Sequence, residues 1–273
     1  MPFPYKTVLV TGATSGIGEA LAERMITNGI FVIAVGRRKD RLDAFVAKHG
    51  ADKTAGEPFD VADLDAIPGW VNRVTATYPK LDSIVLNAGF QRTLDFTHPE
   101  SISLPTVTSE LHTNYLSPVH MVACFLPHLI SIAPAPTSIV LVSSGLAVLP
   151  LPRCANYSAT KAALHNIAWS LRTQLAGSAS PQSHHIKVLE LLPPAVQTEL
   201  HPQQPDLAAT GNVRFGVPLD MYADETWADM VADEDKDEIA HSVHRDKLAD
   251  VEDKRRESYE GFVAVMRKQG ARF

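Results

Sequence analysis

Cysteine is scarce in this chain: only Cys124 and Cys154 occur among 273 residues. Two cysteines supply no disulfide framework, and this composition suits a reducing compartment. Each cysteine is better explained as a small buried hydrophobic residue than as a nucleophile.

The histidines do not form a metal-binding pattern either. His184 and His185 are adjacent, which suits a surface loop, and His241 with His244 lacks a third ligand at helical or loop spacing. We therefore predict that the protein holds no metal.

An excess of positive charge is also missing. The chain has 25 Lys and Arg against 31 Asp and Glu, which gives a formal net charge of -6 and a pI near 6.0. A nucleic-acid-binding face would usually shift this balance the other way. We therefore expect no nucleic-acid partner.

Long hydrophobic runs are absent as well. Pro, His or charged residues interrupt the apolar stretches well before the ~20 residues that a membrane-spanning helix needs. Residues 1–6 carry no charged-then-apolar leader of the secretory type. These features predict a cytoplasmic protein with no membrane span.

The chain does have a regular alternation of short apolar runs with helical patterns. Hydrophobic residues make up 45% of it, enough for one sizeable core, so we expect residues 1–273 to form a single domain. The alternation predicts an α/β fold, a Rossmann-like doubly wound parallel sheet with helices on both faces in three layers. The expected strands are 7–10, 31–35, 57–61, 81–86, 138–143, 186–192 and 238–240. The expected helices are 17–26, 39–49, 64–77, 109–132 with interruptions at Pro118 and Pro127, one beginning near Tyr157, 224–231, and a C-terminal helix at 247–268.

A glycine-rich turn, T-G-A-T-S-G-I-G at residues 11–18, joins the first strand to the first helix. Glycines let the backbone approach a pyrophosphate closely, and the helix start offers free N–H groups and the positive end of its dipole. An ordinary tight turn is the alternative, but the flanking strand and helix are the context that the motif requires. The candidate cofactor-binding residues here are Gly12, Thr14, Ser15, Gly16, Ile17 and Gly18.

The end of the second strand indicates which cofactor would bind. A carboxylate there would bond the ribose 2'-hydroxyl of NAD, whereas arginine accommodates the 2'-phosphate of NADP. Gly36 takes the place of the acid, and Arg37 and Arg38 follow. We therefore predict NADP(H), with Arg37 as the main contact, Arg38 nearby, and Ser15 adding a hydroxyl. The alternative is a solvated pair of surface arginines.

Two further strand ends carry candidate cofactor contacts. Asp60, followed by Val61, closes the third expected strand, and its carboxylate could face the adenine or cap the next helix. Asn87-Ala88-Gly89 closes the fourth expected strand, and small residues there suit a chain that passes close to a ligand.

Tyr157 and Lys161 lie four residues apart in an expected helix, and so on one face of it. A fixed ammonium favours the phenolate and draws the tyrosine pKa down from about 10, so that the phenol can exchange a proton with a substrate oxygen. Most such pairs are only a helix surface. Here a hydroxyl, Ser144, ends the preceding apolar run, and Asn114 lies inside an expected helix, where asparagine is disfavoured.

Together these motifs resemble the short-chain dehydrogenase/reductase family, in its single-domain branch. The likeness runs from about Lys6 to Thr198. Residues 11–18 are similar to the family's T-G-x-x-x-G-x-G loop, residues 87–89 to its N-A-G, and residues 157–161 to its Y-x-x-x-K. Asn114 and Ser144 fall where the family's asparagine and serine belong, with Ser143 as the rival serine.

The resemblance implies a role for each of four catalytic residues. Tyr157 would be the general acid in carbonyl reduction and the base in alcohol oxidation, and Ser144 would hold the substrate oxygen. Lys161 would bond the nicotinamide ribose and lower the tyrosine pKa. Asn114 would anchor a water that leads from Lys161 to solvent.

One departure from the family concerns the loop after the sixth strand, where the usual Pro-Gly is Pro193-Pro194. A second proline removes an N–H and fixes φ, so the loop near the nicotinamide would differ in shape. Pro193, Val196 and Thr198 are nevertheless candidate cofactor contacts by resemblance. Residues 199–232 are expected to form a substrate lid, since 201–218 is rich in Pro, Gln, Gly and Asn.

These features predict an NADP(H)-dependent oxidoreductase acting on a carbonyl or secondary alcohol. The residues around the site and in the lid are mostly apolar, apart from Arg153 and Arg214, which favours an apolar ketone or aldehyde. A non-catalytic NADP(H)-binding regulator is the main alternative, although it would not need all four catalytic residues. A nucleotide-sugar epimerase is disfavoured by the glycine spacing. By resemblance we also expect a homodimer or homotetramer that pairs through the helices holding Asn114 and Tyr157.

Overall fold

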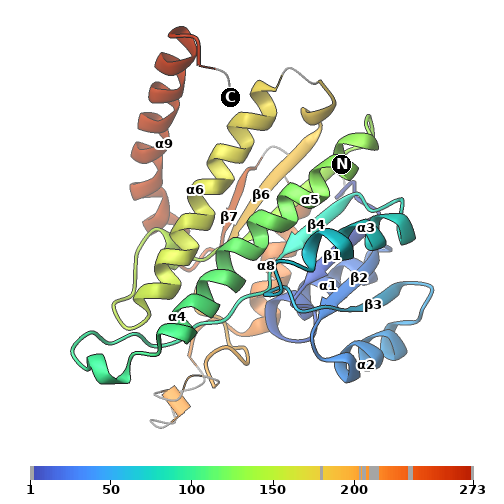
Figure 1. Ribbon diagram of the computed structural model, residues 1–273, viewed down its shortest axis with the longest axis horizontal. Helices are drawn as coiled ribbons and strands as arrows, with labels where there is room; N and C mark the ends of the chain where they lie inside the picture. Colours follow the sequence, from blue (N-terminus) through green and yellow to red (C-terminus); the bar gives the residue numbers. More distant parts are fainter. Residues whose placement is uncertain are drawn as a thin grey trace.

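The computed structural model describes residues 3–178, 181–202, 204, 207–208, 215–232 and 236–271. Within them, seven strands form one parallel sheet in the order β3-β2-β1-β4-β5-β6-β7, and helices cover both faces (Figure 1). The predicted doubly wound α/β fold is thereby confirmed. The strands are β1 (Thr7–Thr11), β2 (Phe31–Gly36), β3 (Thr54–Pro58), β4 (Ser83–Leu86), β5 (Thr137–Val142), β6 (Ile186–Leu192) and β7 (Glu238–Ala240).

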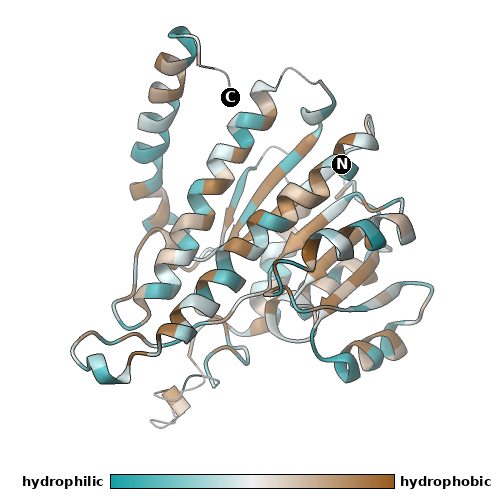
Figure 2. Cartoon of the chain, in the orientation of Figure 1, coloured by the Kyte–Doolittle hydropathy of each residue, from teal (hydrophilic) through white to brown (hydrophobic). Residues whose placement is uncertain are grey.

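The strands alternate their side chains between two hydrophobic cores, one on each face of the sheet. Leu9 and Ile33 point to the core made with helices α3, α5 and α6, whereas Val8 and Val32 point to the core made with α1, α2 and α8. Because both faces are covered, the strands read as continuous apolar runs (Figure 2). The helices are α1 (Gly16–Thr27), α2 (Lys39–His49), α3 (Ile67–Thr77), α4 (Leu104–Leu111), α5 (Ser117–Ser131), α6 (Ala155–Gly177), α8 (Leu219–Ala232) and α9 (Arg245–Lys268).

The helix expected at 109–132 is two α-helices joined by one π-helical turn. α4 begins earlier than predicted, with Ser103 as its N-cap, and residues His112–Leu116 form the wider turn before α5. Pro118 has no N–H to give to the carbonyl of Asn114, and its ring would clash with that carbonyl in a regular helix. The π turn is consistent with this constraint, and it carries Asn114.

The third expected strand was placed too late in the sequence. β3 ends at Pro58, where its ladder with β2 stops opposite Gly36, so Asp60 lies in the loop beyond the strand. Proline cannot donate to a sheet ladder, which accounts for the end of the strand. The 199–232 segment stays a predicted lid, and its last part, from Leu219, is helix α8.

Helix α9 stands beside α6, along the flank of the sheet where β7 forms the edge (Figure 1). Only Leu248 and Glu252 of α9 are buried, and Phe262 and Val265 are largely exposed. Hydrophobic packing therefore supplies little of its attachment to the body of the protein, and polar contacts supply much of the rest.

Candidate active site

The carboxyl ends of the strands surround a cavity of about 770 Å³. Its walls come from the loops after β1 to β6, including Asp60 and Val61 after β3, and from the first turns of α6. His244 and Leu248, at the start of α9, complete one side. A cleft at this edge is where open α/β sheets bind their ligands.

The glycine loop adopts backbone conformations that favour glycine. Gly12 has φ +68° and Gly16 has φ +60°, in the left-handed region. Gly18 is required for space instead, because a Cβ there would overlap the carbonyl of Gly12 and the side chain of Asn87. The loop therefore packs directly on the end of β4.

Thr11 and Asn87 hold these two loops together. The Thr11 hydroxyl accepts hydrogen bonds from the backbone N–H of Asn87 at 2.9 Å and of Ala88 at 3.1 Å. In return, the Asn87 amide donates to the Thr11 carbonyl at 3.0 Å. Thr11 was not among the predicted site residues, although its place at the end of β1 could have suggested this role.

The two arginines after β2 have different surroundings. Arg38 donates to the hydroxyls of Thr14 and Ser15, at 2.9 and 2.8 Å. Arg37 is 75% exposed, and its nearest acid is Asp60 at 3.9 Å. Arg38 is thus the arginine that lies against the glycine loop.

Arg41 and Glu199, which were not among the predicted site residues, also meet at this loop. One carboxylate oxygen of Glu199 accepts from Arg38 at 3.1 Å and the other from Arg41 at 2.8 Å. Arg41 also donates to the Thr14 carbonyl at 3.3 Å. These hydrogen bonds hold the pKa of the Glu199 carboxyl below its usual range, and the bond from Arg41 has the largest effect.

Tyr157 and Lys161 come together in the cavity, one turn apart on α6. Both are buried, and the Lys161 Nζ lies 5.6 Å from the centre of the Tyr157 ring. The same Nζ donates a hydrogen bond of 2.8 Å to the carbonyl of Val142, at the end of β5. α6 and β5 therefore position the ammonium jointly.

The two serines at the end of β5 have separate tasks. The Ser143 hydroxyl donates to the Leu191 carbonyl in β6 at 3.2 Å. Ser144 begins a short 3-10 turn, accepting from the Leu146 N–H at 3.1 Å, and its hydroxyl contacts the Tyr157 phenol. This geometry favours Ser144 as the serine that works with the tyrosine.

Burial is the largest influence on the pKa values of Tyr157 and Lys161. It raises the pKa of Tyr157 above its ordinary value, and the hydrogen bond with Ser144 only partly offsets this. It lowers the pKa of Lys161 to about 8, against the opposing pull of the Glu190 and Glu110 carboxylates. In the structure, desolvation therefore reverses the lowering of the tyrosine pKa that the sequence led us to expect.

Asn114 lies in the π turn, close to Lys161. Its side chain accepts from the Phe90 N–H at 3.0 Å, and donates to the Phe90 carbonyl at 2.9 Å and to the Thr160 hydroxyl at 3.2 Å. A Cβ at Gly89 would come within 2.9 Å of the Asn114 oxygen. Gly89 thus lets the loop pass close to Asn114, whose predicted water stays a prediction.

The loop after β6 forms the opposite wall. The Pro193 carbonyl accepts from the Gly145 N–H at 2.9 Å, and Val196 pairs with Val217. Thr198 packs against Gly16, and its hydroxyl accepts from the Leu200 N–H at 3.3 Å. The loop therefore contacts the glycine turn and leads into the predicted lid.

A chain of polar side chains includes Gln91 and Arg153, which line the cavity. Gln204 donates to Gln91 at 2.8 Å and accepts from Arg153 at 2.6 Å, and Gln91 donates to the Cys154 sulfur at 3.0 Å. Cys154 is buried, as expected, and also serves as an acceptor. Sequence patterns gave no signal for Gln91 or Gln204, and Arg214 lies outside the described residues.

His201 lies close to this chain and is 4% exposed. Its ring lies 4.2 Å from that of Phe215, and within the described part of the chain neither ring nitrogen has a hydrogen-bond partner. Burial and the nearby Arg153 lower the pKa of His201 below its ordinary value. It is therefore a polar group available to a ligand in a mostly apolar pocket.

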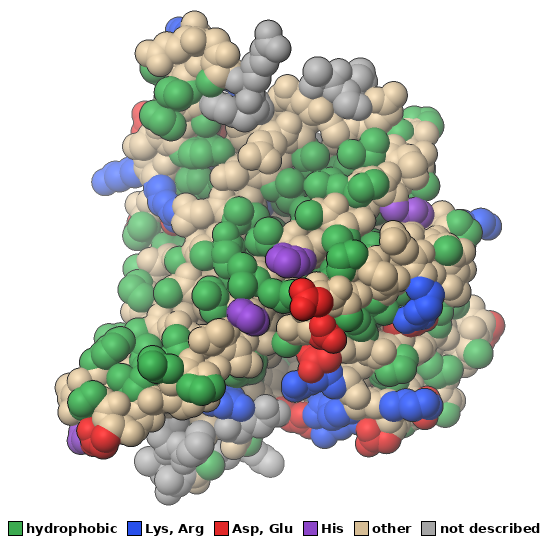
Figure 3. Space-filling view, in the orientation of Figure 1, with side chains coloured by type: hydrophobic (Ala, Val, Ile, Leu, Met, Phe, Trp, Pro, Cys, Tyr) green, Lys and Arg blue, Asp and Glu red, His purple; other side chains and the backbone are tan. Residues whose placement is uncertain are grey.

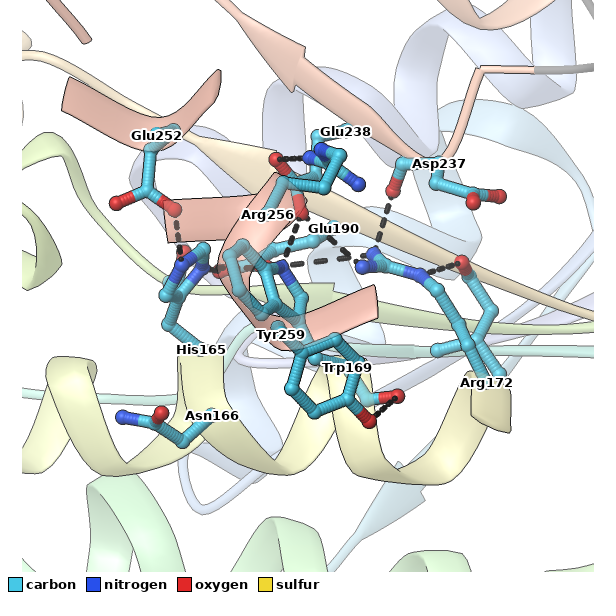
Figure 4. A network of polar contacts seen from close by, with 12 residues as sticks. His165, Asn166, Trp169, Arg172, Glu190, Asp237, Glu238, Glu252, Arg256 and Tyr259 are labelled. Atoms are coloured by element: carbon cyan, nitrogen blue, oxygen red, sulfur yellow. Dashed lines mark hydrogen bonds and ion pairs between the residues drawn. The ribbon is translucent and has the colours of Figure 1, made fainter. Parts of the chain in front are cut away.

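One turn beyond Lys161, helix α6 carries a buried histidine between two carboxylates (Figure 4). His165 Nδ1 lies 2.9 Å from Glu190 of β6, and Nε2 lies 2.8 Å from Glu252 of α9. Burial alone would lower the pKa of His165, but these hydrogen bonds outweigh it and raise the pKa to about 9. The imidazolium therefore links α9 to α6, the helix that carries Tyr157 and Lys161.

Glu238 is close enough to His165 and Glu190 for the three to resemble a metal site. Its carboxylate instead accepts from Trp169 at 2.6 Å, Arg172 at 3.1 Å and Arg256 at 2.6 Å. The guanidinium groups thus already neutralise the negative charge of Glu238. The arrangement is an ion-pair network rather than an open set of metal ligands.

The sequence profile described as short chain dehydrogenase matches residues 6–207. The chain is also 37% identical over 206 residues to the uncharacterized oxidoreductase DltE of Bacillus subtilis. That match covers 76% of this chain and 77% of the Bacillus protein.

Two solved structures share the fold over most of their length. A short chain dehydrogenase from Burkholderia cenocepacia in complex with NADP has a TM-score of 0.74 and 24% identity, covering 96% of this chain and 98% of that one. A short chain dehydrogenase/reductase from Burkholderia phymatum in complex with NAD has a TM-score of 0.77 and 20% identity, covering 91% and 93%. Among the described residues, no helix is both long and apolar enough to span a bilayer.

Proposed function

Because the chain belongs to the short-chain dehydrogenase family and is an oxidoreductase of that family, we propose that it transfers hydride between NADP(H) and a carbonyl or secondary alcohol. The observation that carries this proposal is the meeting of Tyr157, Ser144 and Lys161 in one cavity at the carboxyl ends of the strands, with Asn114 behind them.

In the proposed reduction, the Tyr157 phenol gives its proton to the substrate oxygen while the Ser144 hydroxyl holds that oxygen. The cofactor, when bound, supplies the hydride. The buried Lys161 ammonium stabilises the phenolate left behind, and it is positioned by the Val142 carbonyl. The raised pKa of Tyr157 keeps the phenol protonated and ready to act as the acid.

The choice of NADP(H) is supported by the charges at the end of β2. Gly36 places no carboxylate there, and Arg38, held by Ser15 and Thr14, is suited to a 2'-phosphate. Relatives of this fold hold either NADP or NAD, so the fold alone does not make the choice. We retain Arg37 as a second contact, because it is exposed at the cavity rim.

The proposed substrate is a largely apolar ketone or aldehyde. Leu146, Leu149, Leu151, Val196 and Phe215 line the cavity near the catalytic residues. Apolar walls with a few polar groups are typical of small-molecule sites. Gln91 and His201 are the polar groups that would orient such a substrate.

The first test compares wild type with Tyr157→Phe on a panel of ketones, aldehydes and quinones. We expect NADPH oxidation in wild type and a loss of at least about a hundredfold in the variant, since it removes the proton donor. NADPH binding, followed separately by fluorescence, should be retained. Tyr259→Phe is the matched control, because that phenol bonds Thr173 on the far side of α6.

Two outcomes would change the proposal. Turnover by Tyr157→Phe at the wild-type rate would remove the assigned acid. Tight NADPH binding with no turnover of any carbonyl by wild type would favour the non-catalytic regulator instead.

A further inference from the structure

The Glu199 carboxylate lies between Arg38 and Arg41, beside the glycine loop. Its two oxygens accept from Arg38 and Arg41, and Arg38 also donates to the hydroxyls of Thr14 and Ser15. Two guanidiniums and two hydroxyls thus converge beside the loop. Figure 3 shows Lys and Arg side chains gathered with Asp and Glu low on this face of the molecule, to the left of α2.

A carboxylate and a phosphate monoester make the same demands on such a site. Both accept paired N–H bonds from guanidinium, and the phosphate carries the larger charge, about -1.5 to -2 at pH 7. Arg38 cannot give its full set of donors to both groups at once. The ion pairs with Glu199 are half exposed, so water and competing anions can reach them.

We propose that Glu199 is an internal competitor for the 2'-phosphate of NADP(H) and so sets how strongly the protein prefers that cofactor. This inference rests on the proposed NADP(H) site at Arg38. When the phosphate arrives, Glu199 gives up Arg38 and Arg41. Because NAD(H) lacks the phosphate, it leaves the ion pairs in place.

The test uses two fragments that differ only in the phosphate, adenosine 2',5'-bisphosphate and 5'-AMP, titrated calorimetrically into the full-length protein. Glu199→Gln keeps the side-chain shape and removes the charge. Freeing two surface ion pairs should tighten the bisphosphate about three- to tenfold and leave 5'-AMP unchanged. Asp43→Asn is the matched control, since it removes one charge from α2 where the partner is Lys39. It should change neither affinity.

The outcomes separate this inference from the cofactor assignment. Equal affinity of wild type for the two fragments would contradict the NADP(H) preference, yet a selective gain in Glu199→Gln would still support competition. An unchanged or weakened bisphosphate affinity in Glu199→Gln would overturn the competition, since Glu199 would then be a support for the arginines. The competition would also be overturned if Glu199→Gln bound both fragments more tightly, or if Asp43→Asn bound the bisphosphate more tightly. Either result would assign the change in affinity to the net charge of the protein.

Discussion

In the glycine loop, the side chain that fits at a given position is limited chiefly by the atoms directly around it. Gly18 faces the carbonyl of Gly12 and the amide of Asn87, and that amide in turn holds Thr11. A methyl group at Gly18 would have to displace the backbone carbonyl of Gly12 as well as the Asn87 side chain. The constraint is therefore steric and belongs to the protein with or without a ligand.

We expect Gly18→Ala to lower the free energy of unfolding by about 1–3 kcal/mol, as overpacking does, and to weaken NADPH binding. Gly261→Ala is the opposite case, because no heavy atom lies within 4 Å of a Cβ at that position in α9. It should raise stability by about 0.5–1 kcal/mol through helix propensity. Urea unfolding and cofactor titration measure both effects, and a Gly18→Ala protein as stable as wild type would refute the steric argument.

The residues found from sequence are those whose signal is local. The glycine loop spans residues 11–18, and Tyr157 and Lys161 are one helical turn apart, so spacing alone brings them together. Glu199 meets Arg38 across 161 positions, and Gln204 meets Gln91 across 113. Such contacts depend on how distant loops fold over the sheet, which local periodicity does not encode.

At the scale of elements, the strands were predictable and the irregular helix was not. Buried parallel strands show as apolar runs whatever their neighbours are. The π turn at His112–Leu116, by contrast, depends on how Pro118 is accommodated within a helical pattern that looks continuous. The prolines predicted an interruption of the helix, but they did not predict that it would be a π turn.

The attachment of α9 to α6 should depend on pH through His165. Its folded pKa of about 9 lies above the ordinary value of 6.5, so the folded state binds the proton more tightly than the unfolded state. The resulting stabilisation is complete below pH 6.5 and is lost as pH rises toward 9. We expect wild type to lose on the order of 2–3 kcal/mol of unfolding free energy over this range.

Urea unfolding at a series of pH values would measure this loss. His165→Gln should remove the pH-dependent part, since glutamine cannot carry the charge. His184→Gln, in the exposed loop before β6, should keep it and serves as the control. The same slope in wild type and His165→Gln would assign the effect to another group.

At the scale of the whole molecule, we expect self-association through the face that carries α4, α5 and α6. Leu111, just before the π turn, is 40% exposed there. Leu111→Glu should weaken association at least about tenfold, because an unpaired charge would be buried in the interface. Met221→Glu is the matched control, since Met221 is 60% exposed on α8, across the sheet.

Sedimentation velocity at several protein concentrations would test this expectation. A wild-type protein that stays at the mass of one chain, 29.7 kDa, would contradict it. Dissociation of both variants alike would place the interface elsewhere.

The buried position of His165 also gives the protein an internal spectroscopic signal. Both ring N–H groups are donated to carboxylates, and the side chain is fully shielded from solvent. Protons held in this way exchange slowly with water and resonate far downfield in an NMR spectrum. Because one acceptor belongs to β6 and the other to α9, the two resonances would respond separately when the C-terminal helix detaches.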